Sequence, residues 1–215
     1  MRTNLYNFLS NPIVVIITIS FCVILTYLYG RPGYIFGIVI ALTTLWLSKF
    51  NWTEFGISRP KWPNTLLKAL FYSLIIYVLM DVFIQPYIES AFGTIDISDL
   101  NGIRGNLINY LTFIVFIWVV TGFGEELLYR GYFMKRLALI LGDSNKAWIT
   151  AAFMISILFG LAHSYQGVSG IITTGIISFI LCIVFYRNRT NLILVMLTHG
   201  FYDVIGITLI YLRNH

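Results

Sequence analysis

The sequence predicts an all-α membrane protein, a polytopic helical bundle of about seven or eight transmembrane helices with one amphipathic elbow helix. The chain is 58% hydrophobic and only 11% charged, with a mean hydropathy of +0.83. Soluble domains carry about 25% charged residues, and a water-soluble fold of 215 residues could not hide this much apolar surface. Apolar stretches also recur along the whole chain at lengths near the ~20 residues that a membrane span needs.

Seven of these stretches are predicted as spans. The first lacks a small-x-small cleavage site and has only one basic residue before it, so we interpret it as a span and not as a cleaved signal. No internal repeat is evident. We expect a single integral membrane domain over 1–215, with N-terminal spans in 1–105 and the functional helices in 106–212. The predicted spans are 12–29, 33–48, 65–85, 107–124, 147–163, 168–186 and 191–212.

The segment 125–141 follows the fourth predicted span and is amphipathic. Its apolar residues share one side of a helix, whereas Lys135 and Arg136 lie on a polar side. Glycines at 122, 124 and 131 would permit a bend or close packing here. We therefore expect a helical elbow lying near the membrane surface.

The net charge of +5 indicates loop orientation and not nucleic-acid binding, because basic residues of membrane proteins collect in particular loops. Here they collect in 49–64, 135–146 and 187–190. If seven spans alternate, all three loops fall on the same side. The positive-inside rule then predicts a cytoplasmic N-terminus and a C-terminus outside.

Polar side chains within the apolar helices are candidates for function, because a charge in hydrocarbon costs several kcal/mol and is seldom kept without a role. Glu126 and Arg130 are four residues apart, so they share a helix face and can form an ion pair. Glu125 is rotated from Glu126 by about 100° and would point elsewhere. One carboxylate would be neutralised and the other left for chemistry. The alternative is an interfacial charge cluster that extends into water at the end of the fourth span.

Two further motifs follow in equally apolar sequence. His163 closes an apolar helix with Phe159 four residues earlier, and His199 lies one turn before Asp203. Alone, His163 could be an interface residue, and the second pair could simply hold helices together. General acid–base chemistry on water requires a carboxylate and groups that orient water or stabilise an oxyanion. We therefore predict a site formed by Glu125, His163, His199 and Asp203.

The ordered motifs Glu125-Glu126-x-x-x-Arg130, Phe159-x-x-x-His163 and His199-x-x-x-Asp203 resemble those of the CPBP family of intramembrane proteases. This family of CAAX proteases and bacteriocin-processing proteins, also called Abi, includes the type II CAAX prenyl endopeptidases. The resemblance covers about 110–210. It implies an endopeptidase that cleaves a membrane-associated substrate, either a prenylated CAAX protein or a leader or bacteriocin-type peptide.

The resemblance also implies a role for each matching residue. Glu125 would be the general base that activates water, and His163 would hold that water. His199 and Asp203 would line the site and stabilise the oxyanion, with Asp203 protonated if it is to donate. The supporting residues would be Glu126, Arg130 and Phe159.

The resemblance leaves a cofactor open, because the family is often labelled as metalloproteases. Glu125, His163 and His199 could hold zinc, with water as the fourth ligand. The sequence has no His-Glu-x-x-His helix, and we favour a glutamate mechanism without metal. The two cysteines, Cys22 and Cys182, both lie in apolar segments, where packing is a more typical role than ligation or a disulfide.

A second class of function stays open from the sequence alone. Embedded acids and histidines also suit a non-enzymatic membrane protein, such as a bacteriocin self-immunity partner or a proton-coupled transporter. Transporters usually show two similar halves, which this sequence does not. The small size and the lack of long tails favour a multi-pass protein of a bacterial cell membrane. The substrate and the oligomeric state cannot be predicted.

Overall fold

The computed structural model describes residues 2–213, and it confirms the all-α class. Six of the described helices are long and apolar enough to cross a membrane, and a shorter apolar helix, Pro32–Leu47, lies between the first two. The protein is therefore an integral multi-pass membrane protein. The α-helices are α1 (Arg2–Leu9), α2 (Pro12–Tyr29), α3 (Arg31–Leu47), α4 (Trp62–Tyr77), α5 (Gln85–Phe92), α6 (Leu107–Phe116), α7 (Lys135–Ile140), α8 (Asn145–Ala162), α9 (Gly167–Arg187) and α10 (Leu192–Leu212).

Shorter helical segments complete the chain. Three of them are π-helical: Val78–Ile84 joins α4 to α5, while Ile117–Glu125 and Leu127–Met134 join α6 to α7. The 3-10 helices are Trp52–Phe55, Ser98–Ile103 and Ser164–Gln166. Because π-helical turns are rare and frequently lie at functional sites, the two segments between α6 and α7 make this helix a candidate for function.

The fourth predicted span and the predicted elbow form one helical run, Leu107–Ile140. Leu127–Met134 is almost wholly buried within the protein, and its depth relative to the membrane surface stays a prediction. The glycines that suggested a bend instead admit close neighbours. Gly124 packs on the Tyr34 hydroxyl and Gly131 on Phe55, and neither position has room for a Cβ without a shift of its neighbours.

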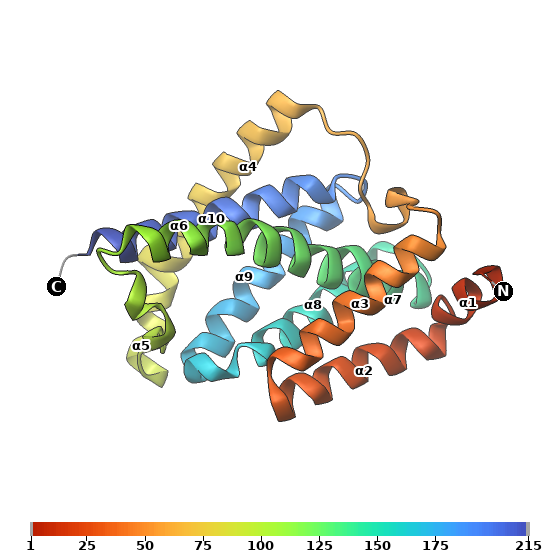
Figure 1. Ribbon diagram of the computed structural model, residues 1–215, viewed down its shortest axis with the longest axis horizontal. Coiled ribbons are helices and arrows are strands. Elements are labelled where there is room, and N and C mark those ends of the chain that lie inside the picture. The colour runs from red at the N-terminus through yellow and green to blue at the C-terminus, as the bar shows by residue number, and fades with distance from the viewer. Residues whose placement is uncertain (1, 214–215) are drawn as a thin grey trace.

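The Leu107–Ile140 run lies against α10 in the opposite direction, and the two are side by side in Figure 1. At one end of this seam the Tyr110 hydroxyl lies 3.0 Å from Oγ1 of Thr208. Nearer the middle, Gly200 packs on the ring of Trp118 so closely that a Cβ would lie 2.5 Å from it. The seam brings the first and third sequence motifs into contact.

The three basic loops lie together at one end of the bundle, as alternating spans require. The backbone N–H of Ser58 donates to the carbonyl of Thr190 at 3.1 Å, and Nη2 of Arg189 donates to Oδ1 of Asn145 at 2.9 Å. These contacts join all three loops. The direction of this end relative to the cytoplasm stays a prediction.

The core holds both cysteines. Cys22 and Cys182 are free and buried, and both belong to one hydrophobic cluster that extends from α2 to α10. The packing role predicted for them is confirmed.

Candidate active site

Glu126 and Arg130 form a buried ion pair at the centre of the bundle. Nη1 of Arg130 donates to Oε1 of Glu126 at 2.9 Å, and neither residue is exposed at all (0%). Arg130 also donates through Nη2 to Oγ and the carbonyl oxygen of Ser178 on α9, at 2.7 and 3.0 Å. The predicted ion pair is confirmed, and the alternative of a cluster extending into water is wrong because no part of either side chain reaches the surface.

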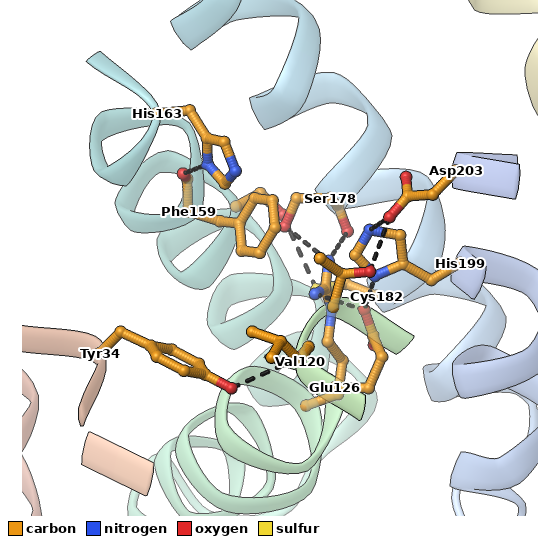
Figure 2. Close-up of polar contacts among 12 residues, drawn as sticks. Tyr34, Val120, Glu126, Phe159, His163, Ser178, Cys182, His199 and Asp203 are labelled. Atoms are coloured by element: carbon orange, nitrogen blue, oxygen red, sulfur yellow. Dashed lines mark hydrogen bonds and ion pairs between the residues drawn. The ribbon is translucent and has the colours of Figure 1, made fainter. Parts of the chain in front are cut away.

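His199 lies between two carboxylates. Its Nδ1 is 2.7 Å from Oε1 of Glu126, and because an ion-paired carboxylate only accepts, this nitrogen is the donor. Its Nε2 lies 3.6 Å from Oδ2 of Asp203, one helical turn further along α10. Figure 2 shows the imidazole between the two acids. Oε1 of Glu126 thus accepts two hydrogen bonds, one from Arg130 on its own helix and one from His199 on α10.

Asp203 is fixed from the other side of the seam. Oγ1 of Thr121 is 2.8 Å from Oδ2 of Asp203 and also 2.8 Å from the carbonyl oxygen of Ile117. Thr121 lies in the π-helical segment Ile117–Glu125, four residues before Glu125. The helical run that carries the first motif is therefore joined to α10 twice, through Glu126 to His199 and through Thr121 to Asp203.

His163 lies directly after the last residue of α8 and is half-buried. Its Nδ1 is 2.9 Å from the carbonyl oxygen of Phe159, and since a carbonyl cannot donate, Nδ1 carries the hydrogen. In the neutral ring Nε2 is then an acceptor. The carbonyl thus sets the tautomer that could hold a water molecule.

The ring of Phe159 connects the second motif to the rest of the site. Its centroid lies 4.7 Å from that of His163 and 6.3 Å from that of His199. Cζ of Arg130 lies 5.0 Å from the same centroid, as a cation over an aromatic face. Figure 2 shows Phe159 between His163 and the buried ion pair. The supporting role predicted for this residue agrees with its position.

Glu125 is half-buried and makes no hydrogen bond through its side chain to any residue within 2–213. Its electrostatic neighbours include His199, Asp203, Glu126 and Arg130. Those of His163 include His199 and Asp203 as well. The electrostatic neighbours of Glu125 and His163 thus include His199 and Asp203 in both cases, so the three motifs lie in one region of the bundle, with Glu126 held and Glu125 uncommitted.

Sequence reasoning missed four residues around the site. Ser178 and Thr121 carry no signal, because hydroxyl side chains in membrane helices commonly bond to their own backbone. Asp81 does carry a clear sequence signal, because it is an acidic residue inside the apolar stretch 65–85. In the structure Tyr202, the neighbour of Asp203, donates to Oδ2 of Asp81 at 3.0 Å.

The ligand set considered for zinc is not assembled in the structure. Within residues 2–213 no three His, Cys, Asp or Glu side chains are grouped as a metal ion would need. His199 directs Nδ1 at Glu126, and His163 directs Nδ1 at a backbone carbonyl. We therefore derive no step through a metal ion.

The fold and the site together define a multi-pass membrane protein with a buried acid–base centre. Residues 107–205 match the family model of type II CAAX prenyl endopeptidase Rce1-like proteins, which confirms the resemblance of the three motifs. The matched region extends from α6 into α10 and contains all the motif residues. The match indicates a protease, in general a CAAX-type intramembrane endopeptidase acting on a membrane-associated peptide or prenylated protein. No curated protein and no solved structure matches the chain.

Proposed function

We propose that the protein is an intramembrane endopeptidase of a bacterial cell membrane in which Glu125 and His163 activate water for peptide hydrolysis. Its substrate would be a prenylated CAAX protein or a leader-type peptide. One observation carries the proposal: Glu126 is committed to Arg130 and His199, whereas the side chain of Glu125 has no hydrogen-bond partner among the described residues. Neighbouring acids with such different surroundings divide structural and chemical work between them.

In the proposed reaction Glu125 takes a proton from water while Nε2 of His163 accepts a hydrogen bond from it. The water oxygen attacks the scissile carbonyl carbon, and the carbonyl electrons move to its oxygen. When this tetrahedral intermediate collapses, the C–N bond breaks. Glu125 returns its proton to the leaving nitrogen, so that an amine and a carboxylic acid are released.

His199 and Asp203 would stabilise the oxyanion. Because Nδ1 of His199 donates to Glu126, Nε2 is the nitrogen left for the substrate side, and it donates to an oxyanion only when both ring nitrogens are protonated. Asp203 lies beside it and can donate only when protonated. Donors fixed in a buried site are effective because they need no reorganisation when charge develops. The ion pair beneath them supplies that rigidity.

The test is a cleavage assay with the reconstituted protein. Candidate substrates come from membrane peptides that differ between cells with the natural protein and with Glu125→Gln. We expect Glu125→Gln to lower the cleavage rate by about 10²–10⁴-fold, the usual contribution of a general base. Asp99→Asn is the matched control, because it makes the same acid-to-amide change at an exposed position outside the site. A chelator in the same assay is expected to leave the rate unchanged.

Three results would contradict this proposal. Full activity of Glu125→Gln would exclude Glu125 as the base. Loss of activity with the chelator, restored by zinc, would replace the mechanism by a metal-dependent one. If no candidate peptide is cleaved and Glu125→Gln leaves the cellular phenotype intact, the protein is a non-enzymatic immunity or transport protein.

A further inference from the structure

A cavity of about 190 Å³ lies at the basic end of the bundle, between the start of α4 and the turn that joins α9 to α10. We call it the basic cavity. Arg59, Lys61 and Lys68 line it together with amide side chains, including those of Asn64 and Asn188, and no acidic residue takes part. The wall of this cavity is polar and cationic.

The three cations have no partner among residues 2–213. Neither Arg59 nor Lys61 nor Lys68 makes a side-chain hydrogen bond or ion pair there, although other basic residues of the same end do. Lys135, for example, donates to the carbonyl of Thr53 at 2.6 Å. Three uncompensated positive charges around one small cavity create a strong local potential for an anion.

An apolar groove adjoins the basic cavity. It encloses about 530 Å³, and its walls include Trp52, Trp62, Trp118, Met196 and Leu197. We call it the tryptophan groove. It shares the residues of the short segment 58–60 with the basic cavity, so a single ligand could extend from one into the other. Tryptophan is enriched where a membrane meets water, because its ring is apolar and its N–H is polar.

The backbone between the two cavities is held in place. The carbonyl of Gly56 accepts from the N–H of Leu192 at 2.8 Å, and Ser58 donates to Thr190 at 3.1 Å. Gly56 has a φ of +74°, and its backbone lies so near the ring of Phe185 that a Cβ would be 2.6 Å from it. Only glycine fits such a position readily. The walls are therefore preformed.

We propose that these two cavities bind one anionic phospholipid, with its phosphate in the basic cavity and an acyl chain in the tryptophan groove. Charge complementarity selects this ligand. A zwitterionic lipid would bring a cation of its own beside the three basic side chains, and a free phosphate ion would leave the groove unused. Basic pockets near the membrane surface attract anionic headgroups with about 1 kcal/mol for each Lys or Arg. None of the residues assigned to catalysis takes part.

The test measures lipid binding to the purified full-length protein in detergent by native mass spectrometry. Short-chain phosphatidylglycerol, phosphatidylcholine of the same chain length and inorganic phosphate are titrated in parallel. We expect phosphatidylglycerol to bind most tightly. Lys61→Gln/Lys68→Gln should weaken its binding about tenfold to thirtyfold, from two lost headgroup contacts. Phosphatidylcholine binding should not change.

Two further variants keep the test specific. Lys49→Gln/Lys146→Gln removes the same charge from exposed sites that do not line the cavity, and it should bind phosphatidylglycerol normally. Trp62→Ala should weaken both lipids, because it removes a wall of the groove. Melting temperatures of all variants check that the fold is intact.

Several outcomes would overturn the proposal. Equal binding of both lipids would exclude a role for the cations, and an equal loss in the control variant would show general attraction to the basic end. Inorganic phosphate that binds as tightly as phosphatidylglycerol would make the site one for a free ion. Normal binding by Trp62→Ala would exclude the groove as the chain site.

Discussion

Two carboxylates, Glu126 and Asp81, lie beside or within π-helical segments of membrane helices, and the structure holds them in different ways. Glu126, between two π-helical segments, is fully buried and accepts from both Arg130 and His199. Asp81, in Val78–Ile84, is half-buried and accepts a hydrogen bond from Tyr202. A cation and an imidazole compensate the first, whereas a single phenol compensates the second.

The difference follows from where the helices lie. Over the 18-residue stretch compared in each candidate span, the spans that contain α8, α9 and α10 have 44%, 44% and 39% of their residues buried, against 22% for Trp62–Phe92 and 17% for Leu107–Ile140, which carries Glu126 itself. Glu126 is enclosed by the more buried helices, so its charge has no access to water and needs opposite charge beside it. Asp81 lies on a more open helix. The comparison indicates that the chain builds its full polar network where other helices enclose the acid on all sides.

The sharpest way to break this comparison is to remove the cation. Arg130→Met leaves Glu126 buried and uncompensated, and we expect a loss of about 3–5 kcal/mol in the free energy of unfolding. The double variant Arg130→Met/Glu126→Gln should regain much of it, because both charges are gone. Reversible unfolding in mixed detergent measures both. The control Arg104→Met is at an exposed position and should change little. A loss from Arg130→Met below about 1 kcal/mol would be the value of a surface pair and would contradict the account.

A second prediction concerns Asp203, the residue of the network that adjoins Tyr202. Asp203→Ala should lower the cleavage rate about a hundredfold, as expected for the loss of one oxyanion donor. Asp203→Asn should stay within about tenfold of the natural protein, because its amide oxygen can still accept from Thr121 while its N–H donates to the substrate. Equal rates for the two variants would show that a donor at 203 is not what matters. Single-turnover rates separate this effect from binding.

The seam between the Leu107–Ile140 run and α10 can be opened directly. Gly200→Ala places a methyl group against Trp118, and we expect it to cost about 1–3 kcal/mol in stability and to lower activity by moving His199. Gly206→Ala is the matched control on the same helix, since no atom lies within 4 Å of its added Cβ. That change should be neutral or stabilising. Equal effects at the two glycines would contradict the close packing of the seam.

The smallest expected effect is at Asp81. Asp81→Asn keeps an acceptor for Tyr202, so we expect a change of about 1 kcal/mol or less in stability and a nearly unchanged cleavage rate. The free energy of unfolding and the cleavage rate are measured in parallel for Glu126→Gln, which should lose far more stability and far more activity. A large loss at Asp81 would show that this acid belongs to the reactive site and would end the contrast drawn here.

Much of this arrangement was predictable from residue spacing. The i, i+4 relation correctly predicted the contact of Glu126 with Arg130 and the closeness of His199 and Asp203. Spacing could not show that Glu126 also reaches His199, because the contact joins two helices far apart in the sequence. The roles of Glu125 and His163 stay predictions.

The fold was predicted in outline, and its errors have a physical cause. A run of apolar residues looks the same whether it faces lipid or protein, so the sequence does not predict that Leu127–Met134 is buried by neighbouring helices. The π-helical segments also escaped prediction. They keep the same composition as an α-helix and differ only in one added residue per turn.

The Leu107–Ile140 run has 34 residues, which at the ~1.5 Å per residue of an α-helix is at most about 50 Å. A hydrocarbon layer of about 30 Å cannot hold such a rod upright, so the rod must lean or project. Because both glutamates lie midway along it, a thinner or thicker bilayer would change their depth and the angle at which a substrate meets them. Reconstitution in lipids of graded acyl length should therefore tune the turnover of this protein, with an optimum at one membrane thickness.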